Sequence, residues 1–204
     1  MKKIMFNDRY RLTDAVIEGR KTMTRRLIPD EFFGLTWDTR GNTLVYENEY
    51  GDFIDVRLSK YTRYKVGEVV AVAQNYFSTY DESKWETGIW YNEFADGSDI
   101  TNHAGWINKM FVKAEYMPHQ IRITGILCER LQDISDAECL KEGVRVEFAR
   151  NGSPMYYYFD TKRWREVWFD TPREAFAALI DKVSGRGTWE SNPWVVVYEF
   201  ELVK

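Results

Sequence analysis

The sequence predicts an α+β fold built around a mixed or closed β-sheet, and two observations support this. Stretches of β-branched and aromatic residues, several of them alternating with polar residues, recur along the chain at unequal intervals. Between them lie segments with apolar spacing and capping residues typical of helices. Strands separated by unequal loops, with helices inserted, are typical of the α+β class.

The first helix is expected after Thr13 or Asp14, either of which can cap it, and it should end at Gly19, because glycine readily takes the left-handed conformation. A strand over residues 22–28 should follow, and Pro29-Asp30 should end it. The other predicted strands are Thr43 to Tyr46, Val69 to Phe77, Gly88 to Tyr91, Gln120 to Leu131 and Trp194 to Val203.

Two further helices are predicted in the second half of the chain. Asp136 to Glu142 is preceded by the capping residue Ser135 and followed by Gly143. Thr161 to Lys182 also has helical spacing, with a break at Thr171-Pro172 as an open alternative. Trp164 and Trp168 lie four residues apart, so they are predicted to form one apolar stripe that packs in the core.

The chain of 204 residues is expected to form a single domain, with insertions near 30–64, 77–116 and 144–160. These three segments combine turn-forming residues with many aromatics. The run Tyr156 to Phe159 within the last of them has two interpretations. It is either a buried strand or a loop that covers the core, or it is a platform on which bases stack.

Composition narrows the classes of function. A net charge of −4 argues against tight, non-specific binding to duplex DNA, and leaves room for a local basic groove that binds a small or short ligand. The apolar stretch near Met1 is too short for a signal peptide, and no run is long enough to span a membrane, so a cytoplasmic protein is expected. Cys128 and Cys139 are expected to be reduced, and His103 and His119 lack the spacing of metal ligands, so no metal site is expected.

The most distinctive motif is the run Gly19-Arg20-Lys21-Thr22-Met23-Thr24-Arg25-Arg26. Its four cations and two hydroxyls could bind an anion, read a base, or activate a hydroxyl with a neighbouring amine. The alternative is an edge strand with a solvated cationic face.

This run resembles the opening motif of the ASCH domain family, whose fold is a PUA-like β-barrel. Segments 65–72, 120–143 and 192–200 also resemble family motifs, in the same order and spacing, so the resemblance covers somewhat under half of the chain. It implies a PUA-like mixed β-barrel with peripheral helices and sizeable insertions. It also implies a partner that is a small nucleoside or a short RNA, while the oligomeric state stays open.

Some small family members are similar to amidohydrolases that remove the acyl group from N4-acetylcytidine without a cofactor. Motif matching assigns their catalytic lysine, threonine and glutamate to Lys21, Thr24 and Glu142. A threonine hydroxyl needs a base, and a lysine can be that base when burial and nearby cations lower its pKa. The expected role of Glu142 is to protonate the departing amine.

Substrate binding is expected from Arg25, Arg26, Gln74 and Arg122. Gln74 stands where longer family members usually carry a glutamate, and a glutamine can form hydrogen bonds but cannot act as a base. The competing function is a non-catalytic RNA- or nucleotide-binding module, which would use the three arginines together with aromatics from the insertions.

The catalytic hypothesis sets two geometric conditions. In a straight strand Lys21 and Thr24 would point to opposite faces, so they meet only if a turn or bulge lies between them. Glu142 must point into the fold, although a glutamate in the last turn of a helix is usually solvated.

Overall fold

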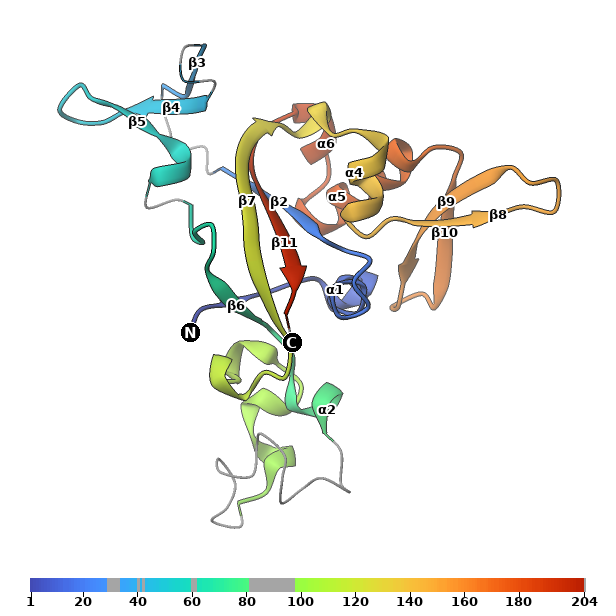
Figure 1. Cartoon of the computed structure of the whole chain (residues 1–204). Helices are drawn as coiled ribbons and strands as arrows, with labels where there is room; N and C mark the ends of the chain where they lie inside the picture. The colour runs from blue at the N-terminus through green and yellow to red at the C-terminus, as the bar shows by residue number, and fades with distance from the viewer. Residues whose placement is uncertain (29–33, 40, 42, 60–61, 81–97, 204) are drawn as a thin grey trace.

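The computed structural model describes residues 1–28, 34–39, 41, 43–59, 62–80 and 98–203. Over these residues the chain is a mixed α+β protein with three β-sheets, which confirms the predicted class (Figure 1). The largest sheet has the strand order β1-β6-β7-β11-β2. Its strands are β1 (Lys3–Ile4), β2 (Met23–Leu27), β6 (Val69–Val72), β7 (Gln120–Arg130) and β11 (Trp194–Leu202).

The main sheet is mixed and curved. β1 pairs with β6 in parallel, and the other neighbouring strands of the main sheet pair antiparallel. The long strands β7 and β11 run side by side, with a bulge between Glu199 and Phe200 that bends their ladder. Arg26 of the edge strand β2 donates from Nη2 to the carbonyl oxygen of Met5 at 2.5 Å, just beyond the other edge strand, β1. This hydrogen bond therefore links the two edges of the sheet.

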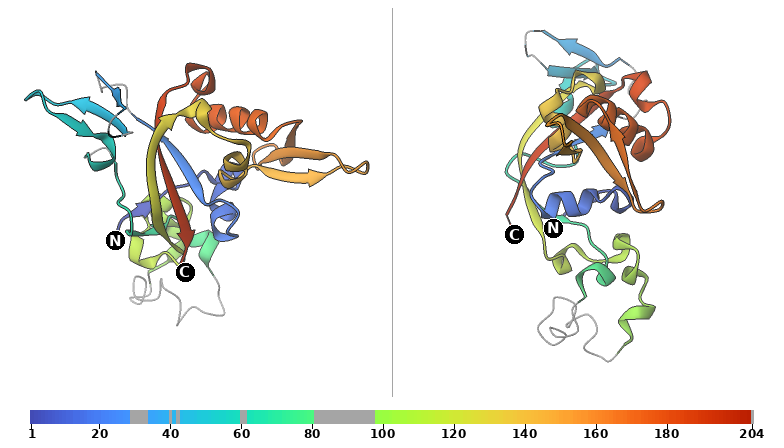
Figure 2. Two further views of the ribbon diagram at one scale, coloured as in Figure 1. Left: turned by 45° about the horizontal axis from the view of Figure 1, so that its top comes forward. Right: turned by 90° about the vertical axis from the view of Figure 1, so that its right-hand side faces the viewer.

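Two smaller antiparallel sheets project on opposite sides of the main sheet (Figures 1 and 2). One contains β3 (Thr36–Asp38), β4 (Thr43–Glu47) and β5 (Phe53–Asp55), and the other contains β8 (Arg145–Phe148), β9 (Pro154–Asp160) and β10 (Arg165–Phe169). In β9 the side chains of Tyr157 and Tyr158 are buried, which confirms the buried-strand interpretation of this aromatic run.

Helices and short 3-10 turns surround the main sheet. The α-helices are α1 (Leu12–Ile17), α2 (Tyr76–Thr79), α4 (Asp136–Lys141), α5 (Pro172–Ser184) and α6 (Thr188–Ser191). The 3-10 turns are η1 (Asp8–Tyr10), η2 (Val56–Leu58), η4 (Ile100–Asn102), η5 (Ala104–Trp106), η6 (Lys109–Phe111), η7 (Ala114–Tyr116) and η8 (Leu131–Asp133). Ser135 caps α4 as predicted and forms a capping box with Glu138.

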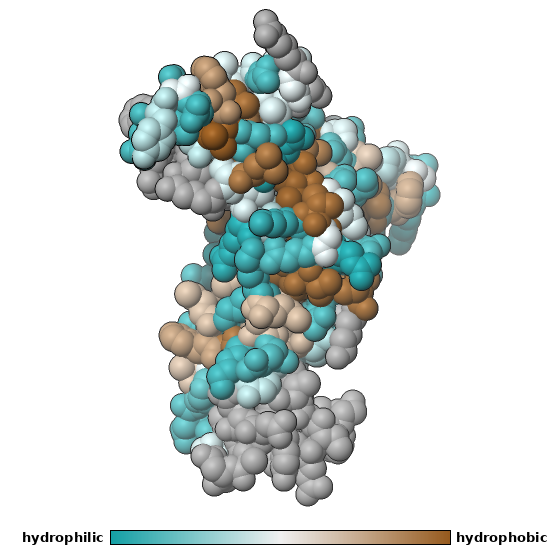
Figure 3. Space-filling view, turned by 60° about the vertical axis from the view of Figure 1, so that its left-hand side comes forward, coloured by the Kyte–Doolittle hydropathy of each residue, from teal (hydrophilic) through white to brown (hydrophobic). Residues whose placement is uncertain are grey.

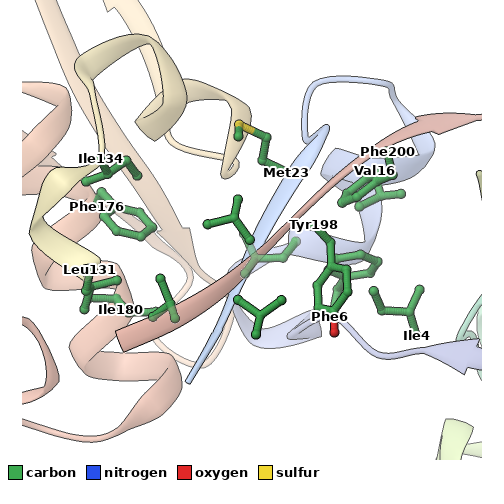
Figure 4. Close-up of a cluster of buried hydrophobic side chains, with 14 of the residues drawn as sticks. Ile4, Phe6, Val16, Met23, Leu131, Ile134, Phe176, Ile180, Tyr198 and Phe200 are labelled. Atoms are coloured by element: carbon green, nitrogen blue, oxygen red, sulfur yellow. The ribbon is translucent and has the colours of Figure 1, made fainter. Parts of the chain in front are cut away.

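The principal core lies where the main sheet meets α1, α4 and α5. Figure 4 shows Val16 of α1, Met23 of β2, Phe176 of α5 and Tyr198 of β11 converging there. A smaller core cluster lies beneath the 3-10 turns of residues 100–116. The segment that follows β1 therefore packs between two cores, because Phe6 belongs to the first and Met5 packs against the second.

Several predicted elements differ from the structure. The strand expected from Val69 to Phe77 ends at Val72, and the chain turns into α2, which Asn75 caps. The helix expected within Thr161 to Lys182 begins only at Pro172, because Thr171 caps it and the preceding residues pair as β10 with β9. α1 begins at Leu12 after Arg11.

Trp164 and Trp168 are therefore not core residues. Trp164 lies in the turn before β10 with φ of 50° and is 79% exposed. Trp168 is 38% exposed and packs on Tyr157 of β9, with ring centroids 4.3 Å apart. The strand predicted over Gly88 to Tyr91 lies outside the described residues.

The surface mixes apolar and polar side chains. Figure 3 shows one face on which separate hydrophobic patches lie among hydrophilic ones. Within the described residues, no helix has the length and apolar character needed to cross a membrane.

Candidate functional site

The turn after α1 carries Lys21 into the protein interior. Gly19 takes φ of +72°, and the backbone N–H groups of Arg20 and Lys21 both donate to the carbonyl of Ala15, at 2.9 and 2.8 Å. The N–H of Thr22 then donates to the carbonyl of Lys141 at 2.9 Å, which joins this turn to the end of α4. Lys21 thus precedes β2, so strand alternation does not separate its side chain from that of Thr24.

Glu142 points into the fold and meets Lys21. It is the C-cap residue of α4, and Gly143 follows with φ of +106°. Lys21 Nζ donates to Glu142 Oε2 at 2.5 Å and to the Glu142 carbonyl oxygen at 2.7 Å. Lys21 is 2% exposed and Glu142 is 5% exposed. The alternative of a solvated glutamate at the helix end is therefore wrong.

A cavity of about 240 Å³ opens beside this ion pair. Lys21, Thr24 and Glu142 all line it. One side is apolar and comes from α5, which contributes Phe176, Leu179, Ile180 and Val183. Its remaining lining residues are Met5, Phe6, Asn7, Leu12, Arg25, Arg26, Leu27 and Ser184. The cavity therefore has a polar end, formed by Lys21, Thr24 and Glu142, and an apolar wall formed by α5.

Burial and the surrounding charges shift the pKa of Lys21. Burial lowers the pKa of Lys21 below its ordinary value; the adjacent Glu142 offsets part of this effect, and the charges of Arg26 and Arg25 lower the pKa further. The ring centroid of Phe6 lies 5.8 Å from Lys21 Nζ and 5.9 Å from Arg26 Cζ. Its aromatic face stabilises positive charge in part.

Arg25 lines the cavity, but its guanidinium is engaged by carboxylates. Its Nη1 donates to Glu142 Oε1 at 3.2 Å, its Nε donates to Glu129 Oε1 at 2.8 Å, and its Nη2 lies 3.4 Å from Glu138 Oε2. Burial opposes this charge, yet Glu142 and Glu129 outweigh it and raise the pKa of Arg25. Arg25 therefore orients Glu142, and the substrate contact expected of it stays a prediction.

Arg26 is the cation that remains accessible. It is exposed, lines the cavity and donates to the Met5 carbonyl. The wall formed by residues 5–7 is also held from behind, because Lys109 Nζ donates to the Phe6 carbonyl oxygen and to Asp8 Oδ1, both at 2.6 Å. Lys109 is 8% exposed, so the segment that carries it fixes one wall of the cavity.

The structure does not bring Gln74 and Arg122 to this cavity. Gln74 lies after β6 in another cavity, where its Oε1 is 2.7 Å from His119 Nδ1. Arg122 lies on the outer face of β7 and pairs with Glu201 at 3.2 Å. Both stay outside the cavity, because β6 ends before Gln74 and the side chain of Arg122 is exposed. Their expected contact with substrate stays a prediction.

Sequence reasoning missed the residues that complete the site. Glu129 and Glu138 hold Arg25, and Phe6 and the apolar face of α5 form the walls. The apolar spacing of α5 is visible in the sequence, but nothing in it indicates that the helix covers this cavity. Among the described residues, no cluster of three or more His, Cys, Asp or Glu side chains is placed to hold a metal ion.

The chain was compared with family models, curated proteins and solved structures, and none of them matches it.

Proposed function

We propose that this chain is an ASCH-type protein directed at nucleosides or RNA, and that it is a metal-independent amidohydrolase that removes the acyl group from N4 of a cytosine nucleoside. One observation carries the proposal. Lys21, Thr24 and Glu142 line a single cavity, and the lysine lies 2.5 Å from the glutamate in a buried environment. A hydroxyl, an amine with a lowered pKa and a carboxyl group are the parts that metal-free acyl transfer needs.

The same proposal includes a nearly closed, PUA-like barrel. Two features support it. The main sheet contains strands from the whole length of the chain, in the order β1-β6-β7-β11-β2. Arg26 links one edge of this sheet to the other through the Met5 carbonyl. An experimental structure that separates these two edges would remove this part of the proposal.

The first half of the reaction transfers the acyl group to Thr24. Lys21 and Glu142 share one proton, which lies on Lys21 in the resting ion pair. In the reactive form this proton lies on Glu142, so Lys21 is neutral and the pair still has no net charge. Thr24 Oγ attacks the acyl carbon and gives its proton to Lys21 Nζ. The bond between the acyl carbon and N4 then breaks, and Glu142 gives its proton to the departing N4 amine. This amine leaves readily because its lone pair is delocalised into the ring.

The second half restores the enzyme. Water attacks the threonine ester, Glu142 accepts a proton from that water, and Lys21 returns its proton to Thr24 Oγ. The products are the free carboxylic acid and cytidine, so one water is consumed in each cycle. Arg25 keeps the Glu142 carboxyl in place through the hydrogen bond at 3.2 Å.

The size of the cavity fits a small substrate. Its volume of about 240 Å³ is below the roughly 300–1,000 Å³ typical of sites for drug-sized ligands. One base with a short acyl group suits it better than several nucleotides. The apolar face of α5 can cover the ring and the acyl group, and the exposed Arg26 can donate hydrogen bonds to a base edge or a phosphate.

A binding module without catalysis is the second candidate. It is favoured by one observation: the Lys21 ammonium has two oxygen partners on Glu142, an arrangement that also serves a purely structural ion pair.

One assay separates the two candidates. The purified protein is incubated with N4-acetylcytidine, and released cytidine is measured by chromatography with ultraviolet detection. Release by the wild type that is lost in Thr24→Val supports the enzyme. No release from any acylated cytosine nucleoside, together with RNA binding that Arg26→Ala abolishes, supports the binding module.

A further inference from the structure

A second polar cavity, of about 390 Å³, lies away from the Lys21 site and shares none of its lining residues. It is formed by α1, α2 and the ends of β6 and β7. The two strands bring Gln74 and His119 together, because the N–H of Val72 donates to the His119 carbonyl at 2.9 Å. The polar groups of this cavity have no part in the chemistry proposed for Lys21.

Gln74 and the partly buried His119 form a pair with unused hydrogen-bonding capacity. Gln74 is 8% exposed, and its Oε1 lies 2.7 Å from His119 Nδ1. In the described part of the chain, neither Gln74 Nε2 nor His119 Nε2 has a hydrogen-bond partner. Both nitrogens are therefore free to form a hydrogen bond with a ligand that enters the cavity.

The pair offers a donor beside an acceptor. Burial lowers the pKa of His119, which keeps its imidazole neutral at pH 7. A neutral ring that donates from Nδ1 to the Gln74 oxygen keeps Nε2 as an acceptor, an assignment that follows from the hydrogen-bond network. The Gln74 amide nitrogen remains a donor. Its complement is a planar edge that carries an acceptor next to an N–H donor, which every nucleobase has.

The rest of the lining favours an uncharged, planar ligand. Phe77 lines the cavity and is 66% exposed, so its ring is available for stacking. The carboxylates of Asp8 and Asp14 also line the cavity, and each is paired with a cation, Lys109 at 2.6 Å and Arg11 at 2.7 Å. Among the described lining residues there is no lysine or arginine. A base fits this environment better than a phosphate.

We propose that this cavity is a nucleobase-binding site, in which Gln74 donates a hydrogen bond to the edge of the base, His119 accepts one from it, and Phe77 stacks on its ring. It lies outside the cavity assigned to acyl transfer. The base belongs either to a free nucleoside or to a single-stranded RNA, which present the same edge.

The test observes the two side chains directly. The full chain, labelled with ¹⁵N, is titrated with the four ribonucleosides, with a short single-stranded RNA and with ribose as a probe that lacks a base. We expect a nucleoside or the RNA, and not ribose, to shift the Gln74 side-chain amide and His119 ring signals. Shifts with nucleosides identify a small-molecule site, and shifts with the RNA alone identify a strand site.

Three variants and one control test the assignment. Gln74→Leu and His119→Phe remove the pair, while Ser78→Tyr keeps the pair and fills the cavity from α2. Each should weaken binding by about tenfold or more, which corresponds to one or two lost hydrogen bonds. Thr24→Val in the other cavity should leave binding unchanged.

If no nucleoside or RNA moves the signals of Gln74 and His119, or if binding survives Ser78→Tyr in a folded protein, the proposal is wrong. Because this readout needs no turnover, its failure leaves the acyl-transfer proposal standing, and the converse also holds.

Discussion

Lys21 and Glu142 are separated by 121 residues in the sequence, yet their side chains meet at 2.5 Å in the interior. The turn after α1 supplies the lysine and the end of α4 supplies the glutamate. The hydrogen bond from the Thr22 N–H to the Lys141 carbonyl holds these two backbone segments together. The positions of the two side chains are therefore set by this backbone contact.

If Thr24 is the nucleophile and Lys21 its base, Thr24→Val and Lys21→Met should each lower the turnover of N4-acetylcytidine by at least about a thousandfold, and the double variant should be no worse. Arg26→Met should mainly raise KM, because its guanidinium binds without taking part in proton transfer. Steady-state kinetics give both parameters, and circular dichroism checks that each variant folds. A rate close to that of the wild type in Thr24→Val would rule out a threonine nucleophile.

The free energy of unfolding should depend more on Glu142 than on Lys21. Glu142→Gln leaves two buried cations without their shared carboxylate, so we expect a loss of about 3–5 kcal/mol. Lys21→Met should cost less, because Arg25 still neutralises Glu142. Glu18→Gln is the control, since its pair with Arg20 is partly solvated and should contribute about 1 kcal/mol or less. Urea denaturation measures all three, and equal losses in the first two variants would contradict the role of Arg25.

Activity should rise with pH, pass through a maximum and then fall. Lys21 accepts a proton from Thr24 only when neutral, so protonation at low pH removes the base. Because burial lowers its pKa, the neutral form appears below the ordinary lysine value of about 10.4. The logarithm of kcat/KM should therefore increase by about one per pH unit until the pair has lost its first proton. It should decrease again at higher pH, where the pair loses the second proton and Glu142 can no longer protonate the departing amine.

The same pH profile has a matched variant. The charge of Arg26 lowers the Lys21 pKa, so Arg26→Met should move the profile to higher pH. A profile that keeps its position in Arg26→Met, or that falls with increasing pH without first rising, would contradict a lysine base.

Gly143 should be less replaceable than Gly19, although both have positive φ. An added Cβ at Gly143 would lie 2.9 Å from Leu12 Cδ2, whereas one at Gly19 would have no heavy atom within 4 Å. Gly19→Ala should cost about 1–2 kcal/mol from backbone strain alone. Gly143→Ala adds crowding of about 1–3 kcal/mol and displaces the neighbouring Glu142, so it should also lower activity. Equal losses of stability in the two variants would show that the packing around Gly143 relaxes freely.

The sequence was informative where local chemistry decides the structure. Ser135 and Gly143 define α4 because capping is local, and the stretches that became β7 and β11 are long enough to be recognised. The partners of Arg25 were not predictable. Glu129 reaches it only through the pairing of β2 with β11 and of β11 with β7, and such register is not written in either segment alone.

Competing local signals explain the main errors. The four-residue spacing of Trp164 and Trp168 suits a helix, but Thr171 and Pro172 start the helix later, and pairing with β9 takes the preceding residues. β6 ends at Val72, two residues before Gln74, so the side chain of Gln74 reaches His119 and not Lys21.

The hydrogen bond from Arg26 to the Met5 carbonyl has a consequence for solubility. Edge strands offer unpaired backbone groups on which another chain can add, and this is a common route to aggregation. β1 is only two residues long. Arg26 lies in β2, and its guanidinium donates to the carbonyl of Met5, the residue that follows β1. Arg26 thus places a charge on one edge strand and occupies a backbone acceptor next to the other. Its replacement by an apolar residue would expose both edges together, so the protein would be expected to self-associate as its concentration rises.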